Sequence, residues 1–197
     1  MKIVGLTGSV GMGKSTAAAL LRRMRVPVYD ADRAVHRFLA AGGAAAGAVA
    51  AAFPGVGSAQ QGIDRKALGA RVFGDRAALR RLEAILHPLV GLDERRFLAR
   101  SRAERRHLVV FDVPLLFETG GDKRCDLVVV MWAPPFLQRA RVLRRPGMNP
   151  ARFAFIRSQQ VSDREKRRRA DILVPSGLGR AVTWRHLRRA LRRANRG

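Results

Sequence analysis

The chain has 197 residues, and its 39 lysine and arginine residues against 15 aspartate and glutamate residues give a formal charge of +24. This length suits one α/β domain with a smaller insert, without metal or disulfide staples. The single cysteine, Cys125, excludes an intramolecular disulfide, and no stretch reaches the roughly 18 apolar residues of a membrane span. Because no secretory signal opens the chain, we expect a soluble, cytoplasmic protein with no membrane partner.

The basic residues are five lysines and 34 arginines, beside abundant alanine and glycine. Such a charge suggests nucleic-acid binding, but it is also what a GC-rich genome produces. One tyrosine and two distant tryptophans provide no series of stacking aromatics. We therefore expect no nucleic-acid partner and interpret most of the charge as solvated surface, although a nucleic-acid-binding NTPase remains a rival. Some of the arginines should bind a polyanionic substrate.

A phosphate-binding loop follows the first apolar run, 3–7, which reads as a strand. Residues 8–15 fit the pattern G-x-x-x-x-G-K-[ST], and a helical segment, 17–23, comes next. Glycines allow backbone N–H groups to converge on phosphate oxygens, a lysine reaches the β- and γ-phosphates, and a hydroxyl can ligate Mg²⁺. The alternative is a chance glycine-rich turn. The predicted ATP-binding residues are Gly8, Gly11, Met12, Gly13, Lys14, Ser15 and Thr16, with Ser15 as the metal ligand.

Two carboxylates end the second predicted strand, 26–29. In an α/β sheet such strand ends face the bound ligand, so a carboxylate there can take a proton from an attacking hydroxyl. Asp32 is the better candidate for this base, while Asp30 could position Mg²⁺-bound water. Either residue could instead cap the following helix.

A helical insert, 33–106, is predicted next, between core segments 1–32 and 107–197. An alanine-rich stretch, 40–52, reads as a loose helix, and later leucines have amphipathic spacing. No strand is expected in the insert. The pair His87-Pro88 favours a helix end or a buried hydrogen bond over acid–base chemistry. The four histidines and Cys125 lack metal-ligand spacing, so we predict no zinc site.

The third and fourth predicted strands are 108–113 and 126–131. Asp112 ends the first of them, where an acidic residue beside a phosphate-binding loop can organise Mg²⁺, although a helix cap or an ion pair is nearly as plausible. The following pair, Leu115 and Leu116, is more typical of core than of a ligand contact.

An arginine-rich lid is predicted at about residues 136–168. Two basic helices joined by a turn at Pro146 fit this stretch. Arg141 and Arg145, four residues apart, would share one helix face and could stabilise charge on a transferring phosphoryl group. A fifth strand, 172–174, precedes an amphipathic helix over 182–193 that should dock against the sheet. The fold class is therefore α/β, with a five-stranded parallel sheet flanked by helices.

Several segments in order resemble dephospho-coenzyme A kinase, a P-loop kinase family. They are Gly5 to Gly8 with Gly11 to Thr16, Asp30-Ala31-Asp32 with His36, His87-Pro88, Asp112 to Glu118, Ala133-Pro134, and Gln160 with Lys166 and Ala170-Asp171. The phosphate-binding loop alone fits many unrelated enzymes. The Asp-Ala-Asp and Asp-Val-Pro-Leu-Leu-Phe-Glu segments at these separations are much narrower signals.

The resemblance implies transfer of the γ-phosphoryl group of ATP to the 3′-hydroxyl of the dephospho-CoA ribose, the last step of coenzyme A synthesis, with Mg²⁺ as cofactor. It implies Asp32 as base, Lys14 and Arg141 as charge stabilisers, Arg145 in ATP binding, and the insert as acceptor-binding domain. The implied acceptor contacts are Asp32, His87, Leu115 and Leu116.

Two segments depart from the family pattern. Ser176 stands where many relatives carry Asn before a glycine, and Pro146 stands where relatives often carry Asp. The adenine contact and the closing contacts of the lid are therefore open. A kinase for another nucleoside or nucleotide is the rival within enzymes.

Overall fold

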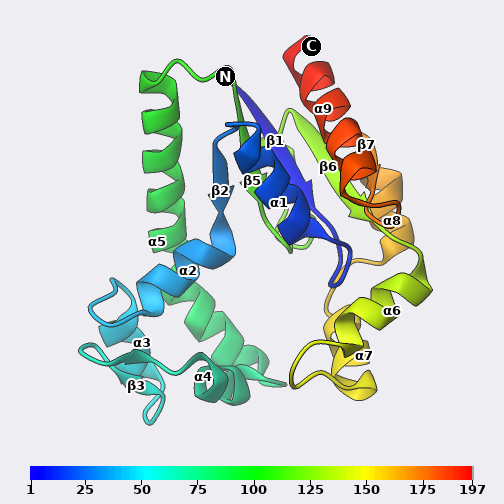
Figure 1. Ribbon diagram of the computed structural model, residues 1–197. Helices are drawn as coiled ribbons and strands as arrows, with labels where there is room; N and C mark the ends of the chain where they lie inside the picture. Colours follow the sequence, from blue (N-terminus) through cyan, green and yellow to red (C-terminus); the bar gives the residue numbers. More distant parts are fainter. Residues whose placement is uncertain (197) are drawn as a thin grey trace. The chain divides into compact units, whose positions relative to one another are not determined.

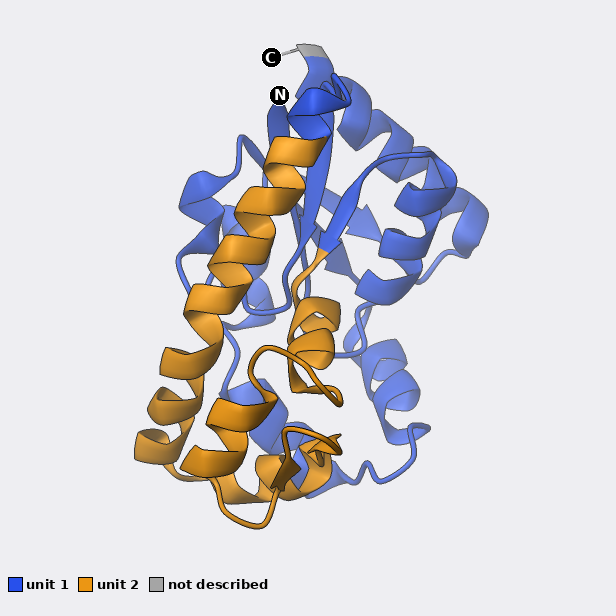
Figure 2. Cartoon of the chain, turned by 90° about the vertical axis from the view of Figure 1, so that its left-hand side faces the viewer, with its two compact units in different colours: residues 1–29, 101–197 blue, residues 30–100 orange. Residues whose placement is uncertain are grey.

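The computed structural model describes residues 1–196, which divide into two compact units. Unit 1 combines residues 1–29 with the chain from Ser101 onward, and unit 2 is residues 30–100 (Figure 2). The second unit thus begins three residues before the predicted insert and ends six residues before its predicted end. In the described chain, no helix is both long enough and apolar enough to cross a bilayer.

Unit 1 contains the five-stranded sheet, in the order β2-β5-β1-β6-β7 (Figure 1). The strands are β1 (Lys2–Thr7), β2 (Val28–Asp30), β5 (Leu108–Asp112), β6 (Leu127–Trp132) and β7 (Ile172–Pro175). All five follow the predicted apolar runs, which are rich in β-branched residues because both faces of a parallel sheet are covered. β1 pairs in parallel with β5 and β6, and the register places Asp112 beside Leu6.

One face of the sheet is covered by α1 (Lys14–Arg23) and α9 (Arg180–Arg196) (Figure 1). Alternate strand residues such as Val4 and Val129 pack there against alanines and leucines of α1 and against Leu187 of α9. Leu187 is 1% exposed, so the predicted docking of the C-terminal helix is confirmed. The phosphate-binding loop is thereby anchored by a buried strand before it and a buried helix after it.

The other face is covered near β6 by Leu116, Phe117 and Val161, which pack on Val128 and Val130. The elements that follow β5 and β6 are η1 (Gly121–Arg124), α6 (Pro135–Leu143), α7 (Pro150–Ser158) and α8 (Asp163–Arg169). The expectation of two helices in the basic segment was therefore wrong, because this region contains three. The extra helix, α8, has the sequence DREKRRR, which carries no apolar period that could reveal it.

Unit 2 is mainly helical and has its own apolar core, which includes Val49, Phe53, Leu68 and Leu86. Its elements are α2 (Ala31–Leu39), α3 (Ala46–Ala52), β3 (Gly57–Ser58), β4 (Gly62–Ile63), α4 (Arg65–Val72) and α5 (Arg76–Ala103), the last of which ends in unit 1. Two expectations were wrong. A short antiparallel hairpin, β3–β4, is present, and α5 continues through Pro88.

Candidate active site

Glycine backbone conformations shape the loop between β1 and α1. Gly11 and Gly13 have φ values of 80° and 83°, a region that side-chain-bearing residues rarely adopt. A Cβ on Gly11 would lie 2.6 Å from Cγ2 of Val142, and one on Gly13 would lie 2.9 Å from the side chain of Ser176. Gly13 also precedes the first turn of α1, whose N–H groups and dipole favour an anion. The loop is therefore built for close approach by phosphate.

Lys14 forms an ion pair at the carboxyl end of the sheet. Its Nζ lies 2.6 Å from Oδ1 of Asp112, the last residue of β5, and the two side chains are 15% and 4% exposed. The ion pair that the sequence left open for Asp112, as an alternative to organising Mg²⁺, is thus present. The ion pair holds the ammonium of Lys14, the lysine of the phosphate-binding loop, beside the end of β5.

Arg141 is fixed against the same loop by Ser176. Its Nη1 donates to Oγ of Ser176 at 2.9 Å and its Nη2 donates to the Ser176 carbonyl oxygen at 2.7 Å, while Nη1 also reaches the Gly11 carbonyl oxygen at 3.4 Å. The Ser176 hydroxyl donates to the Met12 carbonyl oxygen at 2.8 Å. Arg145 lies beyond the end of α6 at Leu143 and is exposed, so the expected shared helix face with Arg141 was wrong.

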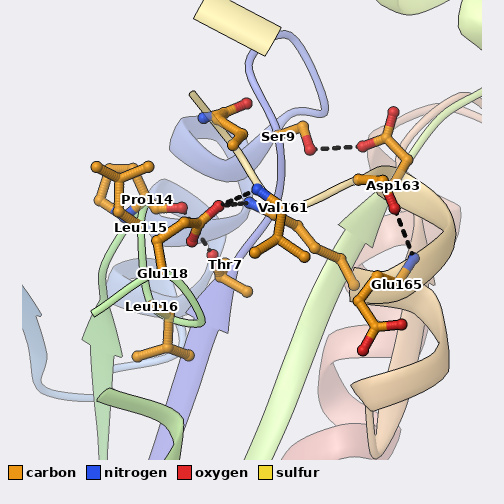
Figure 3. Close-up of polar contacts among 12 residues, drawn as sticks. Thr7, Ser9, Pro114, Leu115, Leu116, Glu118, Val161, Asp163 and Glu165 are labelled. Carbon is orange, nitrogen blue, oxygen red and sulfur yellow. Dashed lines mark hydrogen bonds and ion pairs between the residues drawn. The ribbon is translucent and has the colours of Figure 1, made fainter. Parts of the chain in front are cut away.

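The tip of the phosphate-binding loop is held by three polar side chains. Oε1 of Gln160 accepts from the Val10 N–H at 3.1 Å, and Nε2 of Gln138 donates to the Val10 carbonyl oxygen at 2.8 Å. Asp163 accepts from the Ser9 hydroxyl at 2.5 Å (Figure 3). Sequence reasoning assigned no role to these three side chains, because each lies far along the chain from the loop; Gln160 was noted only as part of the family resemblance.

The segment after β5 lines unit 1 beside β1. Thr7 Oγ1 donates to the Pro114 carbonyl oxygen at 3.0 Å. Leu115 is 40% exposed, whereas Leu116 is 1% exposed and belongs to the core. A Cβ on Gly5 would lie 2.7 Å from Leu116 and 2.9 Å from Sγ of Cys125, so this wall is closely packed.

The remaining predicted site residues belong to unit 2. Asp30 ends β2 and caps α2 by accepting from the Arg33 N–H at 3.0 Å, which is one of the roles that the sequence left open. Asp32 lies in the first turn of α2 and is exposed. His87 is exposed within α5, so neither the helix end nor the buried hydrogen bond expected there is present. Of the two carboxylates Asp30 and Asp32, the capping of α2 therefore belongs to Asp30.

This combination of a parallel sheet, a glycine loop before α1 and a lysine at the end of that loop defines the chain as a P-loop kinase. A likeness of fold alone is seen to shikimate kinase from Acinetobacter baumannii, with a TM-score of 0.54 and 18% identity over 98% of this chain and 94% of that one. The family model for dephospho-CoA kinase matches residues 2–178. The chain therefore belongs to the dephospho-CoA kinase family.

Individual relatives agree with this membership. A dephospho-CoA kinase from Rhodospirillum rubrum is 58% identical over 99% of this chain and 92% of its own length. One from Paramagnetospirillum magneticum is 63% identical over 85% of this chain and 78% of its own length. The crystal structure of TT1252 from Thermus thermophilus superposes with a TM-score of 0.82 at 32% identity, covering 98% of this chain and 96% of that one.

Proposed function

We propose that the chain transfers the γ-phosphoryl group of ATP to the 3′-hydroxyl of the ribose of dephospho-CoA, giving CoA and ADP. Family membership supports the substrate. The observation that carries the reaction is the convergence of two cations, Lys14 and Arg141, on the glycine loop. In-line phosphoryl transfer needs little more than positioning and neutralisation of charge.

Each cation has a distinct part in this scheme. Lys14, at the start of α1, reaches the β- and γ-phosphates once it exchanges Asp112 for phosphate oxygen. Arg141 presents a planar guanidinium whose orientation Ser176 fixes, so it can stabilise charge on the transferring group without reorganising. Arg145 would contact the nucleotide from the segment after α6.

Mg²⁺ would be held by the Ser15 hydroxyl at the start of α1, with Asp112 or Asp30 organising its waters. Within the described residues, no group of three or more His, Cys, Asp or Glu side chains forms a metal site. Hydroxyl and carboxylate oxygens are nevertheless the hard donors that suit Mg²⁺, which usually keeps several waters and binds through phosphates. When bound, the ion supplies neutralisation of the charge on the β- and γ-phosphates.

Asp32 is the proposed general base. It follows the sheet strand β2 by two residues, it is exposed, and the capping of α2 is already performed by Asp30. An ionised carboxylate in this place can accept the proton of the attacking 3′-hydroxyl. The acceptor would also be contacted by residues 33–106, including His87, and by the exposed Leu115, whereas Leu116, at 1% exposed, would take part only after a change in conformation.

The substrate is tested by measuring ADP release from Mg-ATP with and without dephospho-CoA, together with the mass of the product. We expect acceptor-dependent ADP and a product heavier by one phosphate. A nucleoside monophosphate tested in parallel distinguishes the rival kinase. If the monophosphate turns over much faster, the proposed acceptor is wrong.

The base is tested by Asp32→Asn beside Ser15→Ala. We expect both variants to lose turnover by about 100-fold or more, while Asp32→Asn keeps its affinity for ATP because Asp32 is assigned to the acceptor. Asp126→Asn, which removes one partner of an exposed pair with Lys2 outside the insert, is the control and should keep wild-type turnover. Normal turnover in Asp32→Asn would remove it as base.

A further inference from the structure

An ion pair that no catalytic role explains is buried in unit 1. Nζ of Lys166 in α8 lies 2.9 Å from Oε1 of Glu118, and the two side chains are only 1% and 14% exposed. Among the described residues, Oε2 of Glu118 is buried without a hydrogen-bond partner, and Nζ makes the ion pair without a well-directed hydrogen bond. Hydrogen-bonding capacity of both charged groups is therefore left unfilled in the interior.

Stability alone gives no reason for such a pair. Removing two charges from water carries a large desolvation penalty, and apolar side chains of similar volume often serve a fold as well or better. The penalty here is increased by the unfilled capacity of both groups. The pair is better understood through what it connects.

Glu118 connects the segment after β5 to the segment before α8. The same oxygen that contacts Lys166 accepts from the Val161 N–H at 2.8 Å (Figure 3). The preceding residue, Gln160, accepts from the Val10 N–H, and Asp163 in α8 accepts from the Ser9 hydroxyl. One carboxylate thus contacts both Val161 and Lys166, and Gln160 and Asp163 in the same short stretch bond the tip of the phosphate-binding loop.

We propose that Glu118 and Lys166 are positioning residues that set the conformation of loop residues 9 and 10, and hence how tightly the loop binds the ATP phosphates. In the described chain, the polar interactions of these two side chains go to each other and to Val161 rather than to the loop. They act through Val161, Gln160 and Asp163, which lie between the buried pair and the loop. The backbone N–H groups of the loop must already point toward the position that the phosphates will occupy when ATP binds. Displacement of the loop tip therefore weakens both nucleotide binding and phosphoryl transfer.

The test replaces the pair by apolar residues. Glu118→Leu combined with Lys166→Met removes both charges and leaves neither unpaired, so the melting temperature should fall only by the effect of the one hydrogen bond lost from Val161. We expect kcat to fall by about tenfold or more and KM for ATP to rise, with KM for dephospho-CoA unchanged. A double variant with wild-type kcat and KM for ATP would overturn the proposal, because the pair would then serve folding alone.

The matched control is the exposed ion pair of the same helix, Glu165 with Arg168, whose side chains are 35% and 78% exposed. Glu165→Leu with Arg168→Met should leave both kcat and KM for ATP at wild-type values. Glu118→Gln is the second variant if the apolar double variant fails to fold, since its amide oxygen can still accept from Val161. Because Glu118→Gln keeps the Val161 hydrogen bond but removes the ion pair that fixes α8 at Lys166, it should still raise KM for ATP, and wild-type values in it would overturn the positioning role of the pair.

The kinetic readout rests on the proposed function, so a second readout is independent of the acceptor. Calorimetric titration with a non-hydrolysable ATP analogue should give a dissociation constant about tenfold or more higher in the apolar double variant than in the wild type. Equal affinities would overturn the positioning role, whichever acceptor the enzyme uses. Failure of dephospho-CoA as acceptor, with the affinity difference intact, would overturn the proposed function alone.

Discussion

The Lys14–Asp112 pair gives the resting state of the phosphate-binding lysine. In the structure its ammonium is already neutralised at 2.6 Å by a carboxylate that is 4% exposed. Phosphate oxygens must therefore replace an existing partner, and only the difference between the two interactions contributes to binding. The gain lies in geometry, because the lysine is held near the place where the phosphates arrive.

At Arg141 the planar shape of the side chain should matter as much as its charge. Arg141→Lys keeps the charge but cannot reproduce the two hydrogen bonds to Ser176. We expect kcat to fall by about 10- to 100-fold with little change in melting temperature. Arg139→Lys on the exposed side of α6 is the control and should leave kcat unchanged. Equal kcat values in the two variants would show that charge alone suffices.

Gly13 and Gly69 should respond to the same substitution with opposite signs. Gly13→Ala places a Cβ 2.9 Å from Ser176 at φ 83°, so we expect a loss of about 1–3 kcal/mol in the free energy of unfolding. Gly69→Ala in α4 meets nothing within 4 Å and should gain about 0.5–1 kcal/mol. Urea unfolding measures both. If Gly13→Ala were no more destabilising than Gly69→Ala, the strain argument would be contradicted.

At the scale of elements, α4 depends on its cap. Asp64 accepts from the N–H groups of Ala67 and Lys66, and these hydrogen bonds hold the pKa of its carboxyl below the ordinary value of 3.8. A lowered pKa in the folded state means that the stabilisation is complete above about pH 3.8 and is lost as the pH falls through the lower value.

Asp64→Asn keeps a capping side chain but removes the titration. We therefore expect the difference in unfolding free energy between wild type and Asp64→Asn to become less favourable to the wild type as the pH falls below about 3.8. Urea titrations at several pH values measure this difference, and the other carboxylates cancel in the comparison. A difference that is independent of pH would rule out the linkage.

The elements that the sequence predicted well are those with strong local signals. All five sheet strands are apolar runs, and α9 has an apolar face against α1. The hairpin β3–β4 has two residues in each strand, too few for an alternating pattern, and its glycines instead adopt positive φ. The helix α5 continues past Pro88 although that residue cannot donate a backbone hydrogen bond, so the packing of unit 2 overrides the local rule.

The candidate site divides in the same way. The glycine loop, Lys14 and Asp112 follow from a contiguous motif and a strand end. Neither a contiguous motif nor a strand end identifies the loop contacts made by Gln138, Gln160 and Ser176. Each of them reaches the loop across more than a hundred residues of chain. Ser176 was noted only as a departure from the family pattern, and the structure shows it as the residue that orients Arg141.

For the whole molecule, the formal charge of +24 predicts a dependence of stability on salt. Repulsion among the arginines opposes the compact state, and added salt screens it over a Debye length of about 10 Å at 0.1 M. We expect the melting temperature to rise as potassium chloride is increased from about 0.02 to 0.3 M. Sucrose at equal osmolality is the control for effects on water. A falling melting temperature would mean that attractive surface ion pairs dominate.

The contact of Gly5 with Cys125 gives the molecule a built-in chemical reporter. Cys125 is the single cysteine of the chain, it is half-buried, and its sulfur would lie 2.9 Å from a Cβ at Gly5 in β1. Because the thiol is half-buried, a reagent should reach its sulfur faster when the packing with Leu116 opens. The rate of alkylation, followed by intact mass, therefore reports how readily the packing beside β1 opens, without an added probe or an engineered residue.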